Sequence, residues 1–358
     1  MLLGDYIKVS TGKLDANAAS ENGKYPFFTC SKEILKIDNY AFDCECVLLA
    51  GNGDLNVKYY NGKFNAYQRT YVIESLNKDV LDVKFLYLFF EFYLFKLKHV
   101  AIGGVIKYIK LENITKANIF IPSIKEQKEI VYKIEKLKFV LSKVEKQLNL
   151  LDELIKSRFV EMFGDPELNP KNFEKVTFSS LGELARGKSK HRPRNDAILL
   201  GGPYPLIQTG DVASAETYIS EFHSTYSEAG LKQSKMWPKG TLCITIAANI
   251  AESAILTFDA CFPDSVVGFM PNKDTNSLFI KFQLDLLKDY LNSKATAVAQ
   301  KNLNLEKLSS SLFIKPPKEI QDKFAAFVEQ IDKSKFVVQK RIELYKELLN
   351  KKMDEYFN

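Results

Sequence analysis

The feature that most constrains this chain is a pattern of apolar residues that occurs twice, about 194 residues apart. In each copy the apolar residues alternate in steps of four and three, which keeps one stripe of a helix facing a partner helix, as in a coiled coil. Only Lys335, the counterpart of Leu141, interrupts the pattern. The two seams consist of Ile130, Ile134, Leu137, Leu141, Val144, Leu148, Leu151 and Ile155, and of Phe324, Val328, Ile331, Lys335, Val338, Ile342, Tyr345 and Leu349.

The duplication also covers the residues before each seam. Leu3-Gly4-Asp5 opens the first copy and Leu181-Gly182-Glu183 opens the second, and Pro122 and Pro316 precede the two helices. Residues 83–99 and 278–292 read as helices, and residues 118–121 and 311–314 read as short strands that end before a proline. One globular unit followed by one long helix is therefore predicted twice.

These repeats predict an α+β fold with an internal pseudo-two-fold repeat. Two globular α/β units are expected to be separated by two long helices, which a two-fold axis across them would pack as an antiparallel coiled coil. Gly164-Asp165-Pro166 is typical of a helix stop and a short linker. The expected boundaries are 1–122 for the first unit, 123–164 for the central helix, 165–315 for the second unit and 316–358 for the C-terminal helix.

Composition excludes several classes of protein. The apolar stretch 85–97 contains Glu91 and Lys96 and is too short to span a bilayer, which needs roughly 20 apolar residues. The five cysteines lack C-x-x-C spacing and the three histidines are scattered, so we expect reduced thiols in a cytoplasmic protein and no metal site. The net charge of +6 permits a polyanionic partner without requiring one.

Motifs for catalysis are weak or missing. Residues 182–189 match a phosphate-binding loop formally, but Pro193 opposes the helix that such a loop needs, and the first copy, at Lys13, lacks the pattern. We interpret this segment as a turn between strands. The chain has no glycine-rich cofactor loop followed by Asn-Pro-Pro-aromatic, and Asp264 has no acidic-x-Lys partner downstream. No catalytic residue is expected.

Residues that suit nucleic acid are easier to find. Lys188, Lys190, Arg192 and Arg194 put four cations within seven residues, which favours a grip on phosphates, although a solvated basic loop is the alternative. Gln68 and Arg69 can pair with adenine and guanine edges, but as neighbours on an extended strand only one of them would face DNA. Further candidates in loops or turns are Lys13, Asn52, Lys107, Gln208, Asn249 and Lys301.

The chain resembles the specificity subunit of a type I restriction–modification system, because the same order of motifs occurs in two copies. The resemblance covers essentially the whole chain and rests on the two Leu-Gly-acidic openings together with the motifs at 51–53, 66–69, 121–127 and 209–211. It implies two target-recognition domains, each followed by a long helix. Specificity residues vary freely in this family, so the resemblance assigns no base contact.

The resemblance further implies a non-catalytic reader of double-stranded DNA. Each unit would read one half of a bipartite target, and the helices would fix the spacer between the halves. Two methyltransferase subunits and the restriction subunits would be partners, and S-adenosylmethionine, ATP and Mg would belong to those partners.

Two alternatives remain open at this stage. One is an enzyme, which an activity assay on the purified chain would detect. The other is a coiled-coil scaffold without DNA contact, which a gel shift with the methyltransferase partner would distinguish.

Overall fold

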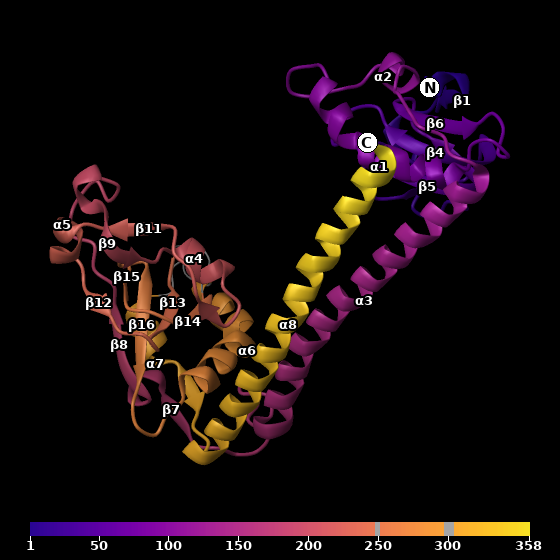
Figure 1. The fold of residues 1–358 in the computed structure, drawn as a ribbon. Coiled ribbons are helices and arrows are strands. Elements are labelled where there is room, and N and C mark those ends of the chain that lie inside the picture. Colours follow the sequence, from indigo (N-terminus) through magenta and orange to yellow (C-terminus); the bar gives the residue numbers. More distant parts are fainter. Residues whose placement is uncertain (248–250, 297–303) are drawn as a thin grey trace. The chain divides into compact units, whose positions relative to one another are not determined.

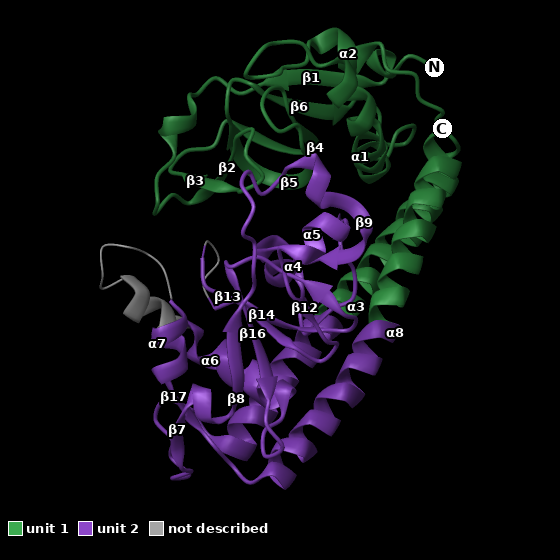
Figure 2. Cartoon of the chain, turned by 90° about the vertical axis from the view of Figure 1, so that its left-hand side faces the viewer, with its two compact units in different colours: residues 1–146, 338–358 green, residues 147–337 purple. Residues whose placement is uncertain are grey.

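The computed structural model describes residues 1–247, 251–296 and 304–358. The chain forms two compact units, one made of Met1–Lys146 with Val338–Asn358 and the other of Gln147–Val337 (Figure 2). Each unit thus contains a globular part and a segment of both long helices. The division into four segments at 122, 164 and 315 stays a prediction about domains.

The first unit is built on a six-stranded sheet with the order β1-β6-β4-β5-β2-β3, of which β1, β6, β4 and β5 are labelled in Figure 1. Its strands are antiparallel except for β2 and β5, which run parallel. Val47 of β4 lies opposite Ile73 of β6, and both side chains are fully buried. The strands are β1 (Ile7–Thr11), β2 (Tyr25–Phe28), β3 (Leu35–Ile37), β4 (Phe42–Ala50), β5 (Val57–Ala66) and β6 (Thr70–Ser75).

One face of this sheet is covered by helix α1 (Val83–Val100). Asp82 caps the helix, because its carboxylate accepts hydrogen bonds from the backbone N–H groups of Lys84 and Phe85. The apolar side of α1 is buried, and Phe85 and Phe89 also pack against Phe357, at ring distances of 5.1 and 6.2 Å. A short helix, α2 (Leu111–Thr115), follows.

The described residues of the second unit form three sheets. Their orders are β10-β14-β13-β16-β8, β11-β9-β15-β12 and β17-β7. The strands are β7 (Lys175–Thr177), β8 (Gly182–Arg186), β9 (Leu200–Leu206), β10 (Tyr218–Ile219), β11 (Ser224–Tyr226), β12 (Met236–Trp237), β13 (Leu242–Thr245), β14 (Ser253–Leu256), β15 (Ala260–Cys261), β16 (Val266–Pro271) and β17 (Leu312–Ile314). The helices of this globular part are α4 (Thr209–Ser214), α5 (Glu228–Lys232), α6 (Ser277–Thr296) and α7 (Leu305–Ser310).

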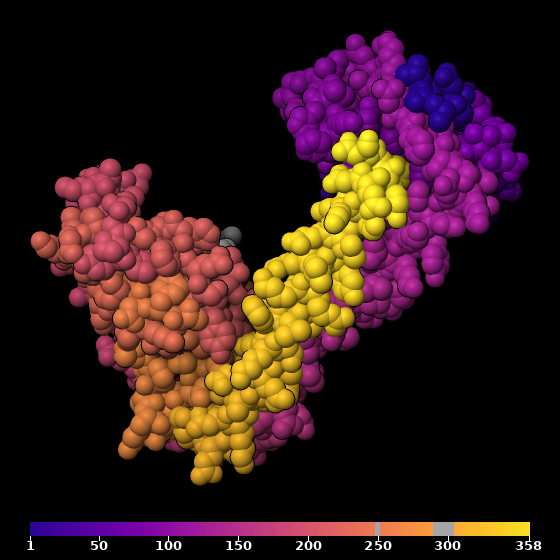
Figure 3. All heavy atoms as spheres, viewed as in Figure 1, coloured from indigo at the N-terminus to yellow at the C-terminus, as the bar shows by residue number. Residues whose placement is uncertain are grey.

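The two long helices are α3 (Ile124–Phe163) and α8 (Lys318–Phe357), and each has 40 residues. In the second unit, Phe159 of α3 packs on Phe324 of α8 with a ring distance of 5.3 Å, and Asp152 pairs with Lys335. In the first unit, Glu145 pairs with Lys346 at 3.2 Å. In the second unit the helices therefore run in opposite directions, and in both units their side chains are in contact (Figure 3).

A buried glutamine joins each long helix to the globular part of its unit. Gln127 is 0% exposed; its amide donates to the carbonyls of Val80 and Pro122 and accepts from the N–H of Asp82. Gln321 is 1% exposed and repeats the arrangement about 194 residues later, with the carbonyls of Asp274 and Pro316 and the N–H of Asn276. Since a buried amide needs all its partners, these bonds fix the start of each helix.

Most of the predicted elements are present. The helices expected at 83–99 and 278–292 are α1 and α6, and the strand expected at 311–314 is β17. Residues 118–121 make only one β-bridge, between Asn118 and Leu2. The interpretation of 182–189 as a turn is wrong, because residues 182–186 form strand β8, which pairs with β16 and leads into a loop. Among the described residues, no helix has the length and apolarity needed to cross a membrane.

Candidate nucleic-acid interface

The five candidates of the first unit lie in segments that meet at one end of the six-stranded sheet. The N–H of Gln68 donates to the carbonyl of Leu14 at 2.9 Å. The N–H of Gly51 donates to the backbone carbonyl of Arg69, and the N–H of Gly53 donates to the backbone carbonyl of Lys107, both at 2.8 Å. These bonds bring together Lys13, Asn52, Gln68, Arg69 and Lys107, which are up to 94 positions apart in the sequence.

Glycines permit this close approach of backbone segments. A Cβ atom at Gly51 would lie 2.4 Å from the carbonyl oxygen of Arg69, and one at Gly12 would lie 1.8 Å from that of Ala66. Neither contact is possible without moving the backbone, so any larger residue would separate the segments. In the Gly51-Asn52-Gly53 motif, Gly51 is therefore required because it has no Cβ and lets the backbone approach Arg69.

Gln68 and Arg69 occupy the turn between β5 and β6. The prediction that they sit on an extended strand and face opposite sides is therefore wrong, because the chain reverses at these two residues. Both side chains are exposed. The Gln68 amide donates to Asp15 Oδ1 at 2.7 Å, so this amide already has a partner within the protein.

An exposed apolar tip lies beside this cluster and was not among the predicted residues. Ile102 and Tyr108 exchange two backbone hydrogen bonds, and the loop between them carries Val105, fully exposed, and Ile106, 63% exposed. The sequence signal was the Gly103-Gly104 pair directly before two apolar residues, which is typical of a tight turn. Such side chains can contact thymine methyl groups or enter a groove.

The basic loop of the second unit is partly neutralised by one carboxylate. Arg194 Nη2 lies 2.5 Å and Arg192 Nη2 3.9 Å from the carboxylate of Asp264, and Arg192 also donates to the carbonyls of Ser189 and His191. Lys188 and Lys190 are exposed. The four cations expected to bind phosphate therefore differ, because the two arginines lie near a carboxylate of the protein and the two lysines are exposed.

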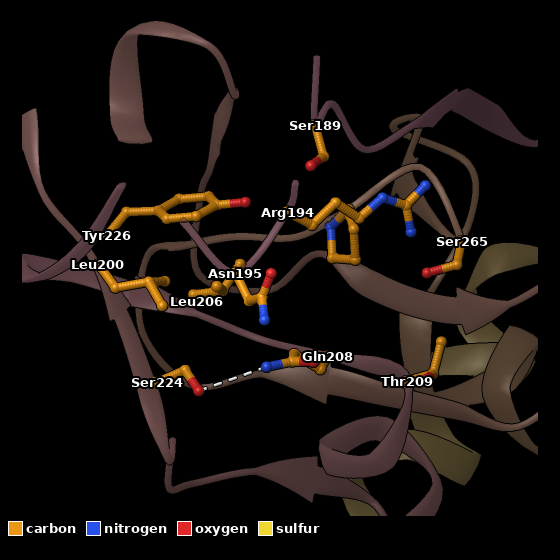
Figure 4. A pocket seen from close by; sticks show the side chains of 11 residues that line it. Ser189, Arg194, Asn195, Leu200, Leu206, Gln208, Thr209, Ser224, Tyr226 and Ser265 are labelled. Carbon is orange, nitrogen blue, oxygen red and sulfur yellow. Dashed lines mark hydrogen bonds between the residues drawn. The ribbon is translucent and has the colours of Figure 1, made fainter. Parts of the chain in front are cut away.

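Arg194 and Gln208 line the same pocket, of about 260 Å³ (Figure 4). The Gln208 amide donates to Ser224 Oγ at 3.3 Å, and its backbone N–H donates to Asp211 Oδ2 at 2.8 Å, which fixes the residue at the start of α4. Ser189, Asn195 and Tyr226 also line the pocket. One pocket is therefore lined by two side-chain types that can read bases, from positions 14 residues apart in the sequence.

One carboxyl and two thiols of the second unit have shifted pKa values. His191 Nε2 donates to Asp196 Oδ2 at 2.9 Å, and this hydrogen bond lowers the pKa of the Asp196 carboxyl. Burial raises the pKa of the Cys243 and Cys261 thiols, which disfavours a nucleophilic thiolate. In the described ranges, no three His, Cys, Asp or Glu side chains are grouped to hold a metal. The candidates Asn249 and Lys301 lie outside the described residues.

Comparisons with known proteins agree with this architecture. The family described as the type I restriction modification DNA specificity domain matches residues 1–151 and 170–346. The type I restriction enzyme EcoDI specificity subunit of Escherichia coli is 28% identical over 92% of this chain and 80% of its own length. A putative type I restriction enzyme MjaX specificity subunit from Methanocaldococcus jannaschii is 22% identical over 67% of this chain and 60% of its length.

Two solved structures share the fold. The S subunit of a type I restriction–modification system from M. genitalium has a TM-score of 0.64 at 14% identity, covering 100% of this chain and 95% of that one. A chain from work on complex assembly and conformational transition of the type I system has a TM-score of 0.63 at 16% identity, covering 99% and 96%. With the family match spanning most of its length, this chain belongs to the type I restriction–modification DNA specificity domain family.

Proposed function

We propose that this chain is the non-catalytic subunit that reads DNA sequence in a type I restriction–modification complex. The observation that carries the proposal is the backbone linkage of Leu14, Gly51–Gly53, Gln68–Arg69 and Lys107, which gathers base-reading and cationic side chains at one end of a rigid sheet. Phosphate contacts position a protein on DNA and base contacts specify the sequence, and this cluster contains residues for both tasks.

The target would be bipartite, with each unit reading one half. Support comes from the matched contacts of Gln127 and Gln321, which join each helix to its globular part in the same way. Such equivalence is what an internal pseudo-two-fold repeat would produce. In this proposal α3 and α8 form an antiparallel coiled coil that holds the two readers at a fixed spacing.

The partners would be two methyltransferase subunits and the restriction subunits, acting on double-stranded DNA in the cytoplasm. Each long helix exposes two leucines at matching places, Leu150 and Leu154 on α3 and Leu344 and Leu348 on α8. Two equivalent apolar sites fit two copies of one partner. S-adenosylmethionine, ATP and Mg would be bound by those partners.

Mapping N6-methyladenine in cells that express the complex tests the proposal. The expected result is one split motif, with two fixed blocks and a constant gap, that disappears when this chain is deleted. A continuous motif, or methylation that persists after deletion, would contradict it. Methyl transfer or cleavage by the purified chain alone would favour the enzyme alternative.

A further inference from the structure

Lys335 is the only charged residue in the two apolar seams. It lies at a position where an apolar side chain would complete the pattern, and its counterpart in α3 is Leu141. Lys335 is 5% exposed; of its neighbours in the seam, Val338 is 4% exposed and Ile331 is half-buried. A lysine with its amine in such a place requires compensation by nearby carboxylates.

The compensation comes from two other parts of the second unit. Lys335 Nζ lies 2.6 Å from Asp152 Oδ1 on α3, and it also donates to the carboxylate of Glu216. Glu216 belongs to the globular part, in the segment between α4 and β10. One buried amine therefore ties together α8, α3 and the globular part.

The cluster keeps Lys335 charged. Burial lowers the pKa of Lys335, but the hydrogen bonds to Asp152 and Glu216 outweigh burial and raise it. Asp332 lies one turn earlier on α8, and burial raises the pKa of its carboxyl while Lys335 and Lys281 lower it. The amine thus faces carboxylates from three segments.

This ion-pair cluster is expected to add little to the folding stability but to specify how the helices and the globular part align. A buried ion pair often contributes no more than apolar residues of similar volume, whereas a polar residue at one seam position can specify how the partners align. Neither Asp152 nor Glu216 is deeply buried, since their side chains are 44% and 57% exposed, so both can be hydrated without Lys335. An apolar replacement is therefore expected to fold.

We propose that Lys335 is a positioning residue that fixes how the globular part of the second unit is attached to the two long helices, and that it thereby keeps the spacer of the DNA target at one length. The inference rests on the proposed function, because the spacer exists only if each unit reads a half-site. Glu216 carries the contact that matters most, since it is the partner supplied by the globular part.

The test uses the complete complex and methylome mapping. We expect Lys335→Met to leave both half-sites unchanged, to leave the complex folded, and to raise the fraction of methylated sites with an altered spacer about tenfold. Lys335→Arg keeps the charge and should restore a single spacer. Lys333→Met, at an exposed position of the same helix, is the matched control and should behave as the wild type.

A second variant separates positioning from folding. Glu216→Ala leaves the Lys335–Asp152 pair intact and changes an exposed side chain, so it should widen the spacer distribution without lowering the melting temperature. A single wild-type spacer in both Lys335→Met and Glu216→Ala would overturn the inference, and so would loss of folding in both. If the wild-type complex showed no split motif at all, the proposed function itself would fail.

Discussion

Asp332 is a half-buried residue whose carboxylate Oδ2 is buried and has no hydrogen-bond partner among the described residues. Burial raises its pKa, Lys335 lowers it and Glu216 raises it, with a net increase. A carboxyl with a raised pKa in the folded state destabilises the protein above that pKa, and the penalty disappears as the pH falls to the unfolded value. We expect Asp332→Asn to stabilise the protein by about 1 kcal/mol at pH 7.

Thermal melting between pH 4 and pH 8 measures the effect. The gain from Asp332→Asn should shrink steadily on acidification. Glu329→Gln, which changes an exposed carboxylate on the same helix, should give little gain at any pH. A loss of stability at pH 7 in Asp332→Asn would mean that the carboxylate is needed in the Lys335 cluster.

The apolar tip gives a prediction about DNA. Val105→Ser with Ile106→Ser should weaken target binding by the complex about tenfold, because fully burying a valine or isoleucine side chain is worth roughly 1.5–3 kcal/mol and an interface buries only part of each. The melting temperature should not change, since both side chains are exposed. Leu76→Ser, an exposed apolar position after the other end of β6, is the control. Unchanged affinity in a filter or fluorescence assay would remove the tip from the interface.

For single residues, the sequence identified candidate side chains better than it identified the side chains they contact. It located the four cations of 188–194, but not Asp264, which pairs with two of them from 70 positions away. Local spacing carries no information about such a tertiary contact. The same reason explains why Gln208 and Arg194 were not predicted to share a pocket.

At the scale of elements, the two buried glutamines should be equally important. Gln127→Leu and Gln321→Leu each leave two carbonyls and one N–H without partners, so each should lower the free energy of unfolding by about 3 kcal/mol. Denaturant unfolding followed by circular dichroism measures this. Gln330→Leu, at an exposed position of α8, is the control. A large loss at only one of the two positions would argue against equivalent joints.

Helices were more predictable than strands. The 4-3 spacing is a local signal repeated over many turns, and together with Pro122, Gly164 and Pro316 it placed α3 and α8 within two residues of their observed ends. Strand β8 was missed because its identity depends on pairing with β16, where Leu184 lies opposite Phe269. The residues next to Gly182–Arg186 in the sequence do not identify that partner strand. The formal match to a phosphate-binding loop led to the prediction of a turn in place of a strand.

At the scale of the whole molecule, each unit combines residues from distant parts of the chain. The first unit needs Val338–Asn358, whose Phe357 packs on Phe85 of α1, and the second needs Gln147–Phe163 of α3. The apolar seam predicts that each helix packs against a partner helix. It does not predict which segment of each helix packs against which globular part. Any change in helix length therefore has to respect both units.

The final prediction concerns the proposed ruler. One heptad inserted in both helices, near Leu148 and Ile342, preserves the seam and adds about 10 Å to each helix. Since DNA rises roughly 34 Å per turn of about 10.5 base pairs, the spacer should lengthen by about three base pairs while both half-sites stay the same. A heptad in one helix alone leaves part of its seam unpaired and should weaken assembly with the methyltransferase. Inserting four residues would instead unwind the pair locally. Methylome mapping of each variant decides the matter, because an unchanged spacer with full activity in the matched variant would show that the helices do not set the distance.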